Sequence, residues 1–490
     1  MKSRILLAVV AVTLLAGLAP AASAPQAKNV ILMIADGASF GAWEAAAYYQ
    51  HGALGKQPYD AFPVKLAAST YPLTTSKEPT GKGSPQVGYD PAAAWDATPA
   101  GKDLFAGYKY LKANVTDSAA AATALSTGVK TYNNAINFAN SPAKTGAPLR
   151  TMAELAKARR RSVGAITSVE WSHATPAALG GAHNIDRDNY VEIANEMLSA
   201  DTLTVLMGAG HPDFDKNAAP REKKDYQYVG GQAAWGALKA GSHPGRWTLI
   251  ETQAAFEALA AGPTPKRVCG TAQAATTLQQ ARSKHTEGEA VGAAPLNKGV
   301  PTLATMTRGA LNVLDNNPAG FFLMVEGGAI DWAAHANQTS RAIEEFIDFN
   351  AAVQAVIDWV NANSNWNETL LIITVDHGNG LPLGSDSATV AFQPVVNNGA
   401  GKMPGVKWHT GNHTNELVPV FAKGAAAAVL ASRVRGQDPK RGPYIDNTDV
   451  FAAMAAAIGE PVPAKAAAKA AGIGAAGAVL LLLLHRRRVA

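Results

Sequence analysis

The side chain best placed for chemistry is that of Ser118, which stands in residues 116–124, TDSAAAATA. Because alanine has a high helix propensity, the run predicts a helix that opens at Ser118 and continues to about Thr127. Gly128 is placed to end this helix in a left-handed conformation. The free amide groups and positive dipole of a helix N-terminus favour an anion, either a serine alkoxide or a phosphate bound beside it. The alternative is a serine that only caps the helix.

A second group of reactive side chains follows apolar segments of the chain. Three runs have the composition of buried parallel strands: residues 30–35, 321–325 and 370–375. Each run leads directly into acidic or imidazole side chains: Asp36, Glu326, and Asp376 with His377. Ligands bind at the carboxyl ends of parallel strands in α/β sheets. Three acids placed in this way predict one shared polar site better than three separate helix caps.

Metal ligation is the chemistry that these residue types favour. Asp331 and His335 are spaced i, i+4, so on a helix both face one side and can hold one ion. His413 stands in a predicted loop before the strand-like residues 418–421. Aspartate and histidine without cysteine suit zinc. Other candidates are oxygen donors, which suit a harder ion such as magnesium: Asp36, Thr175 and Glu326.

Alternating strands and helices must position these groups. Residues 151–154, TMAE, form a capping box that predicts a helix to about Arg160. Further strands are predicted over residues 163–167 and 205–207, and apolar side chains at helical spacing predict an amphipathic helix over 343–360. We therefore predict an α/β fold, with a large central, mostly parallel sheet sandwiched between helices and with insertions over the active-site edge.

Composition and charge limit the possible functions. The chain has 490 residues, of which 47% are hydrophobic, enough for a large core. The net charge is +5, but seven basic residues near the two ends account for it, which leaves about −2 for the rest. Charge therefore gives no support for nucleic-acid binding. Cys269 is the single cysteine, so an intramolecular disulfide is excluded.

The two ends of the sequence predict export. Residues 1–24 combine Lys2 and Arg4, an apolar stretch over 5–18 and the small residues of 22–24, as a cleaved signal peptide does. A membrane anchor is the alternative, although the apolar stretch is short for one. Residues 461–490 form a low-complexity, apolar and arginine-terminated tail. A sorting signal that is cut after export and a weak membrane or cell-envelope anchor fit this tail equally well.

Taken together, the motifs resemble the alkaline phosphatase family. They occur in the family's order between about residues 29 and 424: Asp36-Gly37, 115–120 (VTDSAA), 127–130 (TGVK), 173–178 (HATPAA), 325–328 (VEGG), Asp331-x-x-x-His335 and Asp376-His377. The resemblance implies the family's fold over residues 25–460 as one catalytic domain. Two less regular stretches, about 214–301 and 379–408, are interpreted as insertions in this domain.

The resemblance also implies a role for each site residue. Ser118 would be the nucleophile that accepts the phosphoryl group, and Arg187 would grip two phosphate oxygens. Asp117, His173 and Trp332 would complete the substrate-binding site. Two zinc ions and one magnesium ion are implied, with three ligand sets: Asp331, His335 and His413; Asp36, Ser118, Asp376 and His377; and Asp36, Thr175 and Glu326. His409 competes with His413 for its place, and spacing to residues 420–424 favours His413.

Position 332 separates subgroups of the family. Many bacterial members resemble this chain elsewhere but carry lysine there, and animal members carry histidine. The pair His173 and Trp332 is similar to a bacterial subgroup from marine and cold-adapted organisms. Because the side chain at this position is uncharged, the sequence does not determine whether the third metal site is occupied or how fast phosphate is released.

The function implied by the resemblance is that of an exported metal-dependent phosphomonoesterase. It would hydrolyse small phosphate monoesters to an alcohol and inorganic phosphate through a phosphoserine on Ser118, as a homodimer located in the periplasm, the cell envelope or outside the cell. One alternative is a phosphodiesterase of the same superfamily, which usually has a threonine nucleophile and lacks the third metal. Another is a non-catalytic exported binding or surface-layer protein that keeps the fold. Ser118, Thr175 and Glu326 favour the monoesterase.

Overall fold

The computed structural model describes residues 26–83, 88–141 and 146–461. The predicted signal peptide and almost all of the predicted tail lie outside these residues. Among the described helices, none is long and apolar enough to cross a membrane.

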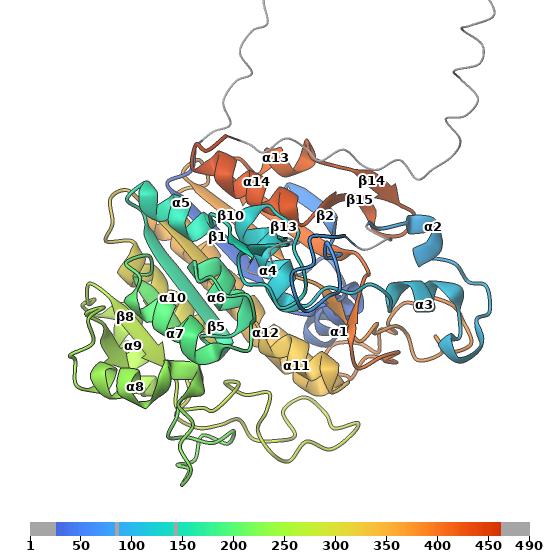
Figure 1. The fold of residues 1–490 in the computed structure, drawn as a ribbon. Coiled ribbons are helices and arrows are strands. Elements are labelled where there is room, and N and C mark those ends of the chain that lie inside the picture. The colour runs from blue at the N-terminus through green and yellow to red at the C-terminus, as the bar shows by residue number, and fades with distance from the viewer. Residues whose placement is uncertain (1–25, 84–87, 142–145, 462–490) are drawn as a thin grey trace, which may run out of the picture.

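A single sheet of 11 strands forms the centre of the molecule (Figure 1). Its middle strand, β1 (Asn29–Ile34), pairs in parallel with β9 (Phe321–Glu326) on one side and β10 (Thr369–Thr374) on the other. Every residue of these three strands is buried, as their continuous apolar sequences require. The register aligns Ile34 with both Glu326 and Thr374, so the three strands end together. The three strands predicted from the sequence are thereby confirmed.

The remaining strands extend the sheet on both sides. Beyond β9 lie, in order, β5 (Ser162–Glu170), β6 (Val205–Ala209), β8 (Val268–Thr271) and β7 (Thr248–Ile250), all paired in parallel. Beyond β10 lie β13 (Val418–Gly424), β2 (Val64–Ser69), β15 (Gly442–Asp446) and β14 (Gly436–Asp438). β13 is antiparallel to both neighbours, and β14 is antiparallel to β15. Two antiparallel strand pairs in the described residues stand apart from this sheet: β3 (Phe138–Ala139) with β4 (Ala147–Pro148), and β11 (Gly378–Asn379) with β12 (His413–Thr414).

Helices cover both faces of the sheet (Figure 1). One layer packs together α1 (Phe40–His51), α12 (Thr339–Asn363), α10 (Leu303–Leu314) and α9 (Gln253–Ala261). The other contains α4 (Ser118–Thr127), α5 (Met152–Ala158), α6 (Ala174–Gly180), α7 (Tyr190–Ser199), α13 (Ala428–Ala431) and α14 (Thr448–Ala457). The shorter or peripheral helices are α2 (Pro91–Ala94), η1 (Gly101–Asp103), α3 (Ala106–Leu111), η2 (Gln227–Val229), α8 (Gly231–Lys239) and α11 (Ala329–His335). The predicted α/β fold with a mostly parallel sheet between helices is confirmed.

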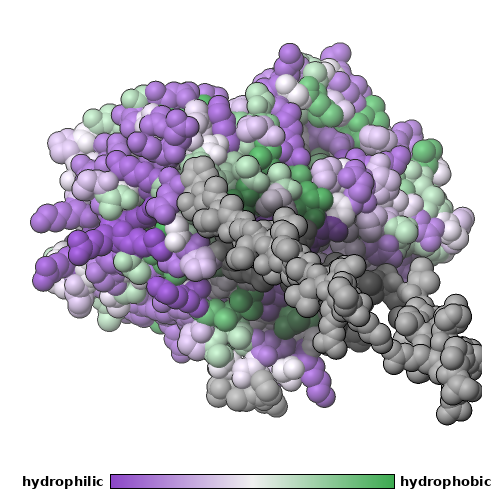
Figure 2. Space-filling model, turned by 90° about the horizontal axis from the view of Figure 1, so that it is seen from above, coloured by the Kyte–Doolittle hydropathy of each residue, from purple (hydrophilic) through white to green (hydrophobic). Residues whose placement is uncertain are grey.

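Local sequence signals account for several element boundaries. The capping box at Thr151 and Glu154 is present, and it begins α5 at Met152. The predicted amphipathic helix is α12, which buries Phe346, Phe349 and Val353 against the sheet side. Viewed from above, hydrophilic residues dominate the rim of the molecule, and hydrophobic ones gather toward the middle of that face (Figure 2).

The two stretches interpreted as insertions differ from each other. Part of residues 214–301 joins the central sheet, because β8 and β7 extend its edge next to β6. Residues 379–408 are mostly irregular and include two isolated bridges, Leu383 with Lys407 and Val396 with Gly405. The first stretch therefore belongs partly to the sheet itself and does not only lie over it.

Candidate active site

Ser118 is the first residue of α4, whose observed bounds agree with the predicted helix. The N-cap is Asp117, which accepts a hydrogen bond from the Ala120 amide at 2.9 Å. Gly128 ends the helix with a φ of 73°, as predicted. The alternative of Ser118 as the capping residue is therefore wrong, and its Oγ lies instead 3.1 Å from His377 Nε2.

One group of ligand-type side chains surrounds His377 at the carboxyl ends of β1 and β10. His377 Nε2 lies 3.6 Å from Asp36 Oδ1 and 3.1 Å from Asp376 Oδ2. All three side chains are buried. Their nitrogen and oxygen atoms lie close enough together for one metal ion.

A second group forms around Asp331 on α11. His335 Nε2 lies 3.3 Å from Asp331 Oδ2, and His413 Nε2 lies 3.6 Å from Asp331 Oδ1. The two imidazole nitrogens are 3.1 Å apart, and the His413 ring stacks on that of His377 at 3.7 Å. The structure thus brings the two predicted zinc ligand sets side by side.

Backbone carbonyls orient the imidazoles of this second group. His335 Nδ1 donates to the carbonyl of Gly411 at 2.8 Å, and His413 Nδ1 donates to that of Thr116 at 2.8 Å. A carbonyl can only accept, so each ring carries a proton on Nδ1, and Nε2 is the ring nitrogen that faces Asp331. Metal-binding histidines usually have such a second hydrogen bond.

The third predicted set consists of oxygen donors beside Asp36. Glu326, at the end of β9, is fully buried, and its Oε2 accepts a short hydrogen bond from Thr167. Several oxygens here are buried without a hydrogen-bond partner: both oxygens of Asp36, Oε1 of Glu326 and Oγ1 of Thr175. Buried oxygens are costly without a partner, so this set fits a hard cation.

Electrostatics support the same interpretation. Burial and the neighbouring carboxylates raise the pKa of Asp36 well above its usual range. Burial likewise raises the pKa of Asp376 to about 6 and that of Glu326 to about 7. Burial lowers the pKa of His377 well below its usual value. Burial and mutual repulsion make it costly for these acids to be ionised together. Cations bound among them would stabilise their charged forms.

The predicted phosphate-binding side chains contact one another and line one cavity with Ser118. Arg187 Nη1 lies 3.2 Å from Asp117 Oδ2, and Arg187 Nη2 donates to His173 Nε2 at 3.2 Å. Burial and the Arg187 charge lower the pKa of His173 to about 3, so this imidazole is neutral. The Trp332 ring lies edge-on to His173, with ring centroids 6.0 Å apart.

A cavity of about 450 Å³ joins these groups. Its walls consist of Ser118, His173, Arg187, Asp331, Trp332, His335 and His413. His409 lies elsewhere, since its Nε2 contacts Ser387 Oγ at 2.7 Å and its ring packs on Tyr108 at 4.7 Å. The structure therefore places His413, and not His409, beside Asp331.

Three contacts in the site were missed from the sequence. Thr167 bonds Glu326, and Asn379 Nδ2 donates to Asp331 Oδ1 at 2.7 Å. Gly37 has a φ of 65°, and a Cβ there would fall 2.3 Å from Asp331 Oδ1. Thr167 is a polar residue within an otherwise apolar strand, which is the signal that could have identified it. Asn379 has only its proximity to His377 as a signal.

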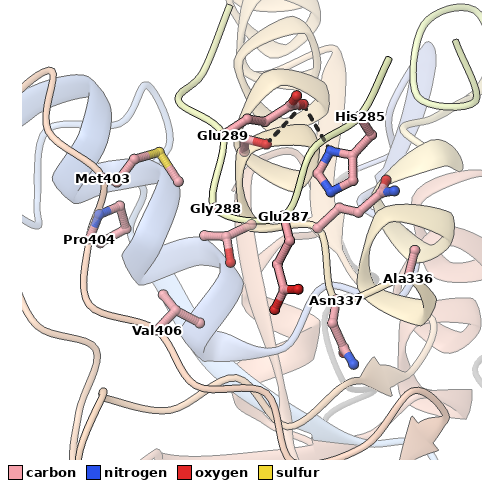
Figure 3. A pocket seen from close by; sticks show the side chains of 12 residues that line it. His285, Glu287, Gly288, Glu289, Ala336, Asn337, Met403, Pro404 and Val406 are labelled. Carbon is pink, nitrogen blue, oxygen red and sulfur yellow. Dashed lines mark hydrogen bonds and ion pairs between the residues drawn. The ribbon is translucent and has the colours of Figure 1, made fainter. Parts of the chain in front are cut away.

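A larger cavity, of about 570 Å³, lies where the two predicted insertions meet (Figure 3). Its lining comes from residues 285–289, 336–340 and 403–406. Glu289 in this lining accepts hydrogen bonds from His285 and from the neighbouring Arg341. This cavity contains none of the motif residues, so we place the candidate active site in the smaller cavity.

Comparison with known proteins agrees with this geometry. A family model described as alkaline phosphatase matches residues 27–403. The chain belongs to the alkaline phosphatase family. Members of this family depend on metal ions, in agreement with the two ligand groups around His377 and Asp331.

Individual alkaline phosphatases match different shares of the chain. Alkaline phosphatase 4 of Bacillus subtilis is 36% identical over 275 residues, which cover 54% of this chain and 50% of that protein. The match thus spans about half the length of that relative. The Escherichia coli alkaline phosphatase is 28% identical over 91% of this chain and 88% of its own. Streptomycin-6-phosphate phosphatase of Streptomyces griseus is 28% identical over 88% and 91%, respectively.

Solved alkaline phosphatases share the fold. The enzyme from the Antarctic bacterium TAB5 has a TM-score of 0.58 and 22% identity, with 89% of this chain and 98% of that chain covered. The Thermus thermophilus enzyme has a TM-score of 0.61 and 21% identity, with 89% and 93% covered. The large sheet between helices is therefore the alkaline phosphatase fold.

Proposed function

We propose that the protein is an exported, metal-dependent phosphomonoesterase with Ser118 as its nucleophile. The observation that carries this proposal is the position of Ser118 Oγ, 3.1 Å from His377 Nε2 and in one cavity with Arg187. A serine at a helix N-terminus, a guanidinium and two ligand groups together match the needs of phosphoryl transfer. Streptomycin-6-phosphate phosphatase, a relative along most of the chain, is named for a phosphate monoester.

The metal ligands that we propose are those in the three groups described above. Asp331, His335 and His413 would hold one zinc ion, and Asp36, Asp376 and His377 with Ser118 would hold the other. Asp36, Thr175 and Glu326 would hold magnesium, because their buried oxygens lack partners. When bound, the zinc ions would supply positive charge near the attacking and leaving oxygens and would lower the pKa of the Ser118 hydroxyl.

The chain's own residues then bind and orient the substrate. Arg187 donates two hydrogen bonds to nonbridging phosphate oxygens, and Asp117 holds the guanidinium in place at 3.2 Å. Ser118 Oγ attacks phosphorus as the bond to the leaving oxygen breaks, and that oxygen is protonated to give the alcohol. Water then attacks the phosphoserine, which releases inorganic phosphate and restores the serine hydroxyl.

Trp332 has a separate proposed role in product release. It lines the cavity beside His173 and offers one indole N–H and no charge. A bound phosphate therefore has one cationic neighbour fewer than in a homologue with lysine at this position. We propose that phosphate leaves more readily for this reason, which raises the rate wherever release limits turnover.

Export, dimerisation and envelope attachment also belong to the proposal. Export rests on residues 1–24, and attachment or sorting rests on residues 461–490. A homodimer is an expectation from the family. Its test is the molar mass of the purified chain by light scattering.

The reaction type can be tested with two chromogenic esters. We expect hydrolysis of p-nitrophenyl phosphate and little hydrolysis of its bis-ester. Ser118→Ala should lower monoester turnover on the order of a thousandfold or more. Ser126→Ala is a matched control, because Ser126 lies on the same helix but donates to the Ala178 carbonyl at 2.9 Å. Preferred hydrolysis of the bis-ester would indicate a phosphodiesterase, and hydrolysis of neither ester would indicate a binding protein.

A further inference from the structure

Ser39 occupies an unusual position at the start of α1. It is the N-cap residue of this helix, yet its side chain makes no capping hydrogen bond to the helix. N-cap serines ordinarily accept a hydrogen bond from an amide of the first turn, and this contact stabilises the helix. The Ser39 hydroxyl instead bonds Glu416 and Asn379, which lie outside α1.

Those partners lead to the proposed metal centre. Ser39 Oγ donates to Glu416 Oε1 at 2.5 Å and accepts from the backbone N–H of Asn379 at 3.2 Å. Asn379 in turn donates from Nδ2 to Asp331 Oδ1 at 2.7 Å. Ser39 and Asn379 are fully buried. Hydrogen bonds therefore link Glu416 through Ser39 to the backbone of Asn379, and the side chain of Asn379 bonds the carboxylate of Asp331.

Glu416 also reaches the strand that carries His413. Thr414 Oγ1 donates to the same Glu416 oxygen at 2.6 Å. Thr414 follows His413 in β12, and Asn379 pairs with His413 where β11 and β12 lie antiparallel. One branch from Glu416 thus leads to Asp331 and the other to the neighbour of His413, and we assign both Asp331 and His413 to one zinc ion.

The neighbouring glycine agrees with this arrangement. A Cβ at Gly378 would fall 2.6 Å from Glu416 Cγ and 2.5 Å from Thr414 Oγ1. Any larger residue would displace the Glu416 side chain. Gly378 therefore keeps open the space that Glu416 needs to contact Ser39 and Thr414.

We propose that Glu416, acting through Ser39 and Asn379, is a positioning residue for the zinc ion held by Asp331, His335 and His413. The Glu416 carboxylate holds the Ser39 hydroxyl, and this hydroxyl holds the backbone of Asn379. The side chain of Asn379 then orients Asp331 Oδ1. This inference rests on the proposed metal centre. Groups that orient metal ligands typically contribute about 10–100-fold to metal affinity.

The test is zinc affinity, measured by competition with a chromophoric chelator, so it is independent of phosphatase activity. Ser39→Ala and Glu416→Ala should each weaken one zinc equivalent per chain by about 10–100-fold. Glu416→Gln should stay within about threefold of the wild type, because both hydroxyls donate to one oxygen, which glutamine retains. If Glu416→Ala does not fold, Ser39→Ala alone decides the outcome.

Thr302→Ala is the matched control for Ser39→Ala. Thr302 is also an N-cap residue, and its Oγ1 accepts from the Thr305 amide at 3.1 Å. Loss of this capping hydrogen bond should lower the stability of the protein and leave its zinc affinity unchanged. The proposal is contradicted by an unchanged zinc affinity in folded Ser39→Ala, by an equal loss in Thr302→Ala, or by a loss in Glu416→Gln as large as in Glu416→Ala. A wild-type chain that binds no zinc would instead contradict the metal centre itself.

Discussion

At the scale of single residues, Trp332 is an uncharged side chain at a position where we propose that charge controls phosphate release. Its ring lies beside His173 on the wall of the candidate active site. Trp332→Lys would add a charge within reach of bound phosphate. One charge-assisted contact is typically worth about 1.5–3 kcal/mol, so the inhibition constant for inorganic phosphate should fall by about an order of magnitude.

Steady-state inhibition assays with added phosphate measure this effect directly. Trp332→Phe is the control, since it stays aromatic and uncharged and should leave the inhibition constant close to that of the wild type. A Trp332→Lys enzyme with lower stability but unchanged phosphate inhibition would show that Trp332 is only a packing residue.

Asp117 combines two roles that substitutions can separate. Its Oδ1 caps α4, and its Oδ2 pairs with Arg187. Asp117→Asn retains a capping oxygen but removes the charge, so KM should rise with little change in thermal stability. Asp117→Ala should in addition lower the stability by about 1 kcal/mol, through loss of the cap. Kinetic assays and thermal unfolding of both variants check this, and equal KM values in Asp117→Asn and wild type would rule out the Arg187 role.

At the scale of elements, α12 carries an acid whose burial makes stability depend on pH. Burial, with a smaller effect of Asp348, raises the pKa of Glu345 to about 8 from a usual value of 4.5. The folded protein therefore keeps this proton over a range in which the unfolded chain loses it. Stability decreases as pH rises from about 4.5 to about 8, where the loss is complete.

Glu345→Gln removes this dependence. The variant should gain stability over the wild type as pH rises, by on the order of 2–4 kcal/mol at pH 9. Glu344→Gln is the neighbouring control, because Glu344 pairs with the buried Arg282 at 2.6 Å and its loss should destabilise the fold. Denaturant unfolding at pH 5, 7 and 9 gives the comparison. A stability difference between wild type and Glu345→Gln that does not change with pH would contradict it.

Elements also show how far the sequence alone could be interpreted. The strands β1, β9 and β10 were predictable because both faces of each are buried, which requires continuous apolar runs. β7 and β8 were missed because they are only three and four residues long, too short for a clear apolar run. Asp117 and Ser118 are both good capping residues, so spacing alone could not decide which of them caps α4.

The same limit applies to the site. Asp36, Glu326, Asp376 and His377 could be identified because they follow predicted strands, and Asp331 and His335 because they share a helical face. The contacts from Ser39 to Asn379 and Glu416 join residues about 340 and 377 positions apart. Local periodicity contains no information about such contacts, since they depend on the way the whole sheet assembles.

At the scale of the whole molecule, residues near the two ends of the described chain contact each other or a common helix. The Ala27 amide donates to the Ala457 carbonyl at 2.7 Å, and Arg159 pairs with Glu460 at 3.0 Å. These contacts use residues up to 460 but none beyond. A chain truncated after Pro461 should therefore keep its thermal stability and its kcat for p-nitrophenyl phosphate. Loss of soluble activity in this truncation would show that the tail takes part in the catalytic fold.

The central claim, that Ser118 is a phosphoryl-accepting nucleophile, is tested most directly by trapping the phosphoenzyme. Acid quenching during turnover of a labelled phosphate monoester, followed by peptide mapping, identifies the modified residue. We expect one labelled peptide, with phosphate on Ser118, and no label in Ser118→Ala. Ser118→Ala should remain folded, because alanine is well tolerated at a helix start whose cap is Asp117. Phosphate on a peptide that does not contain Ser118 would contradict the assignment.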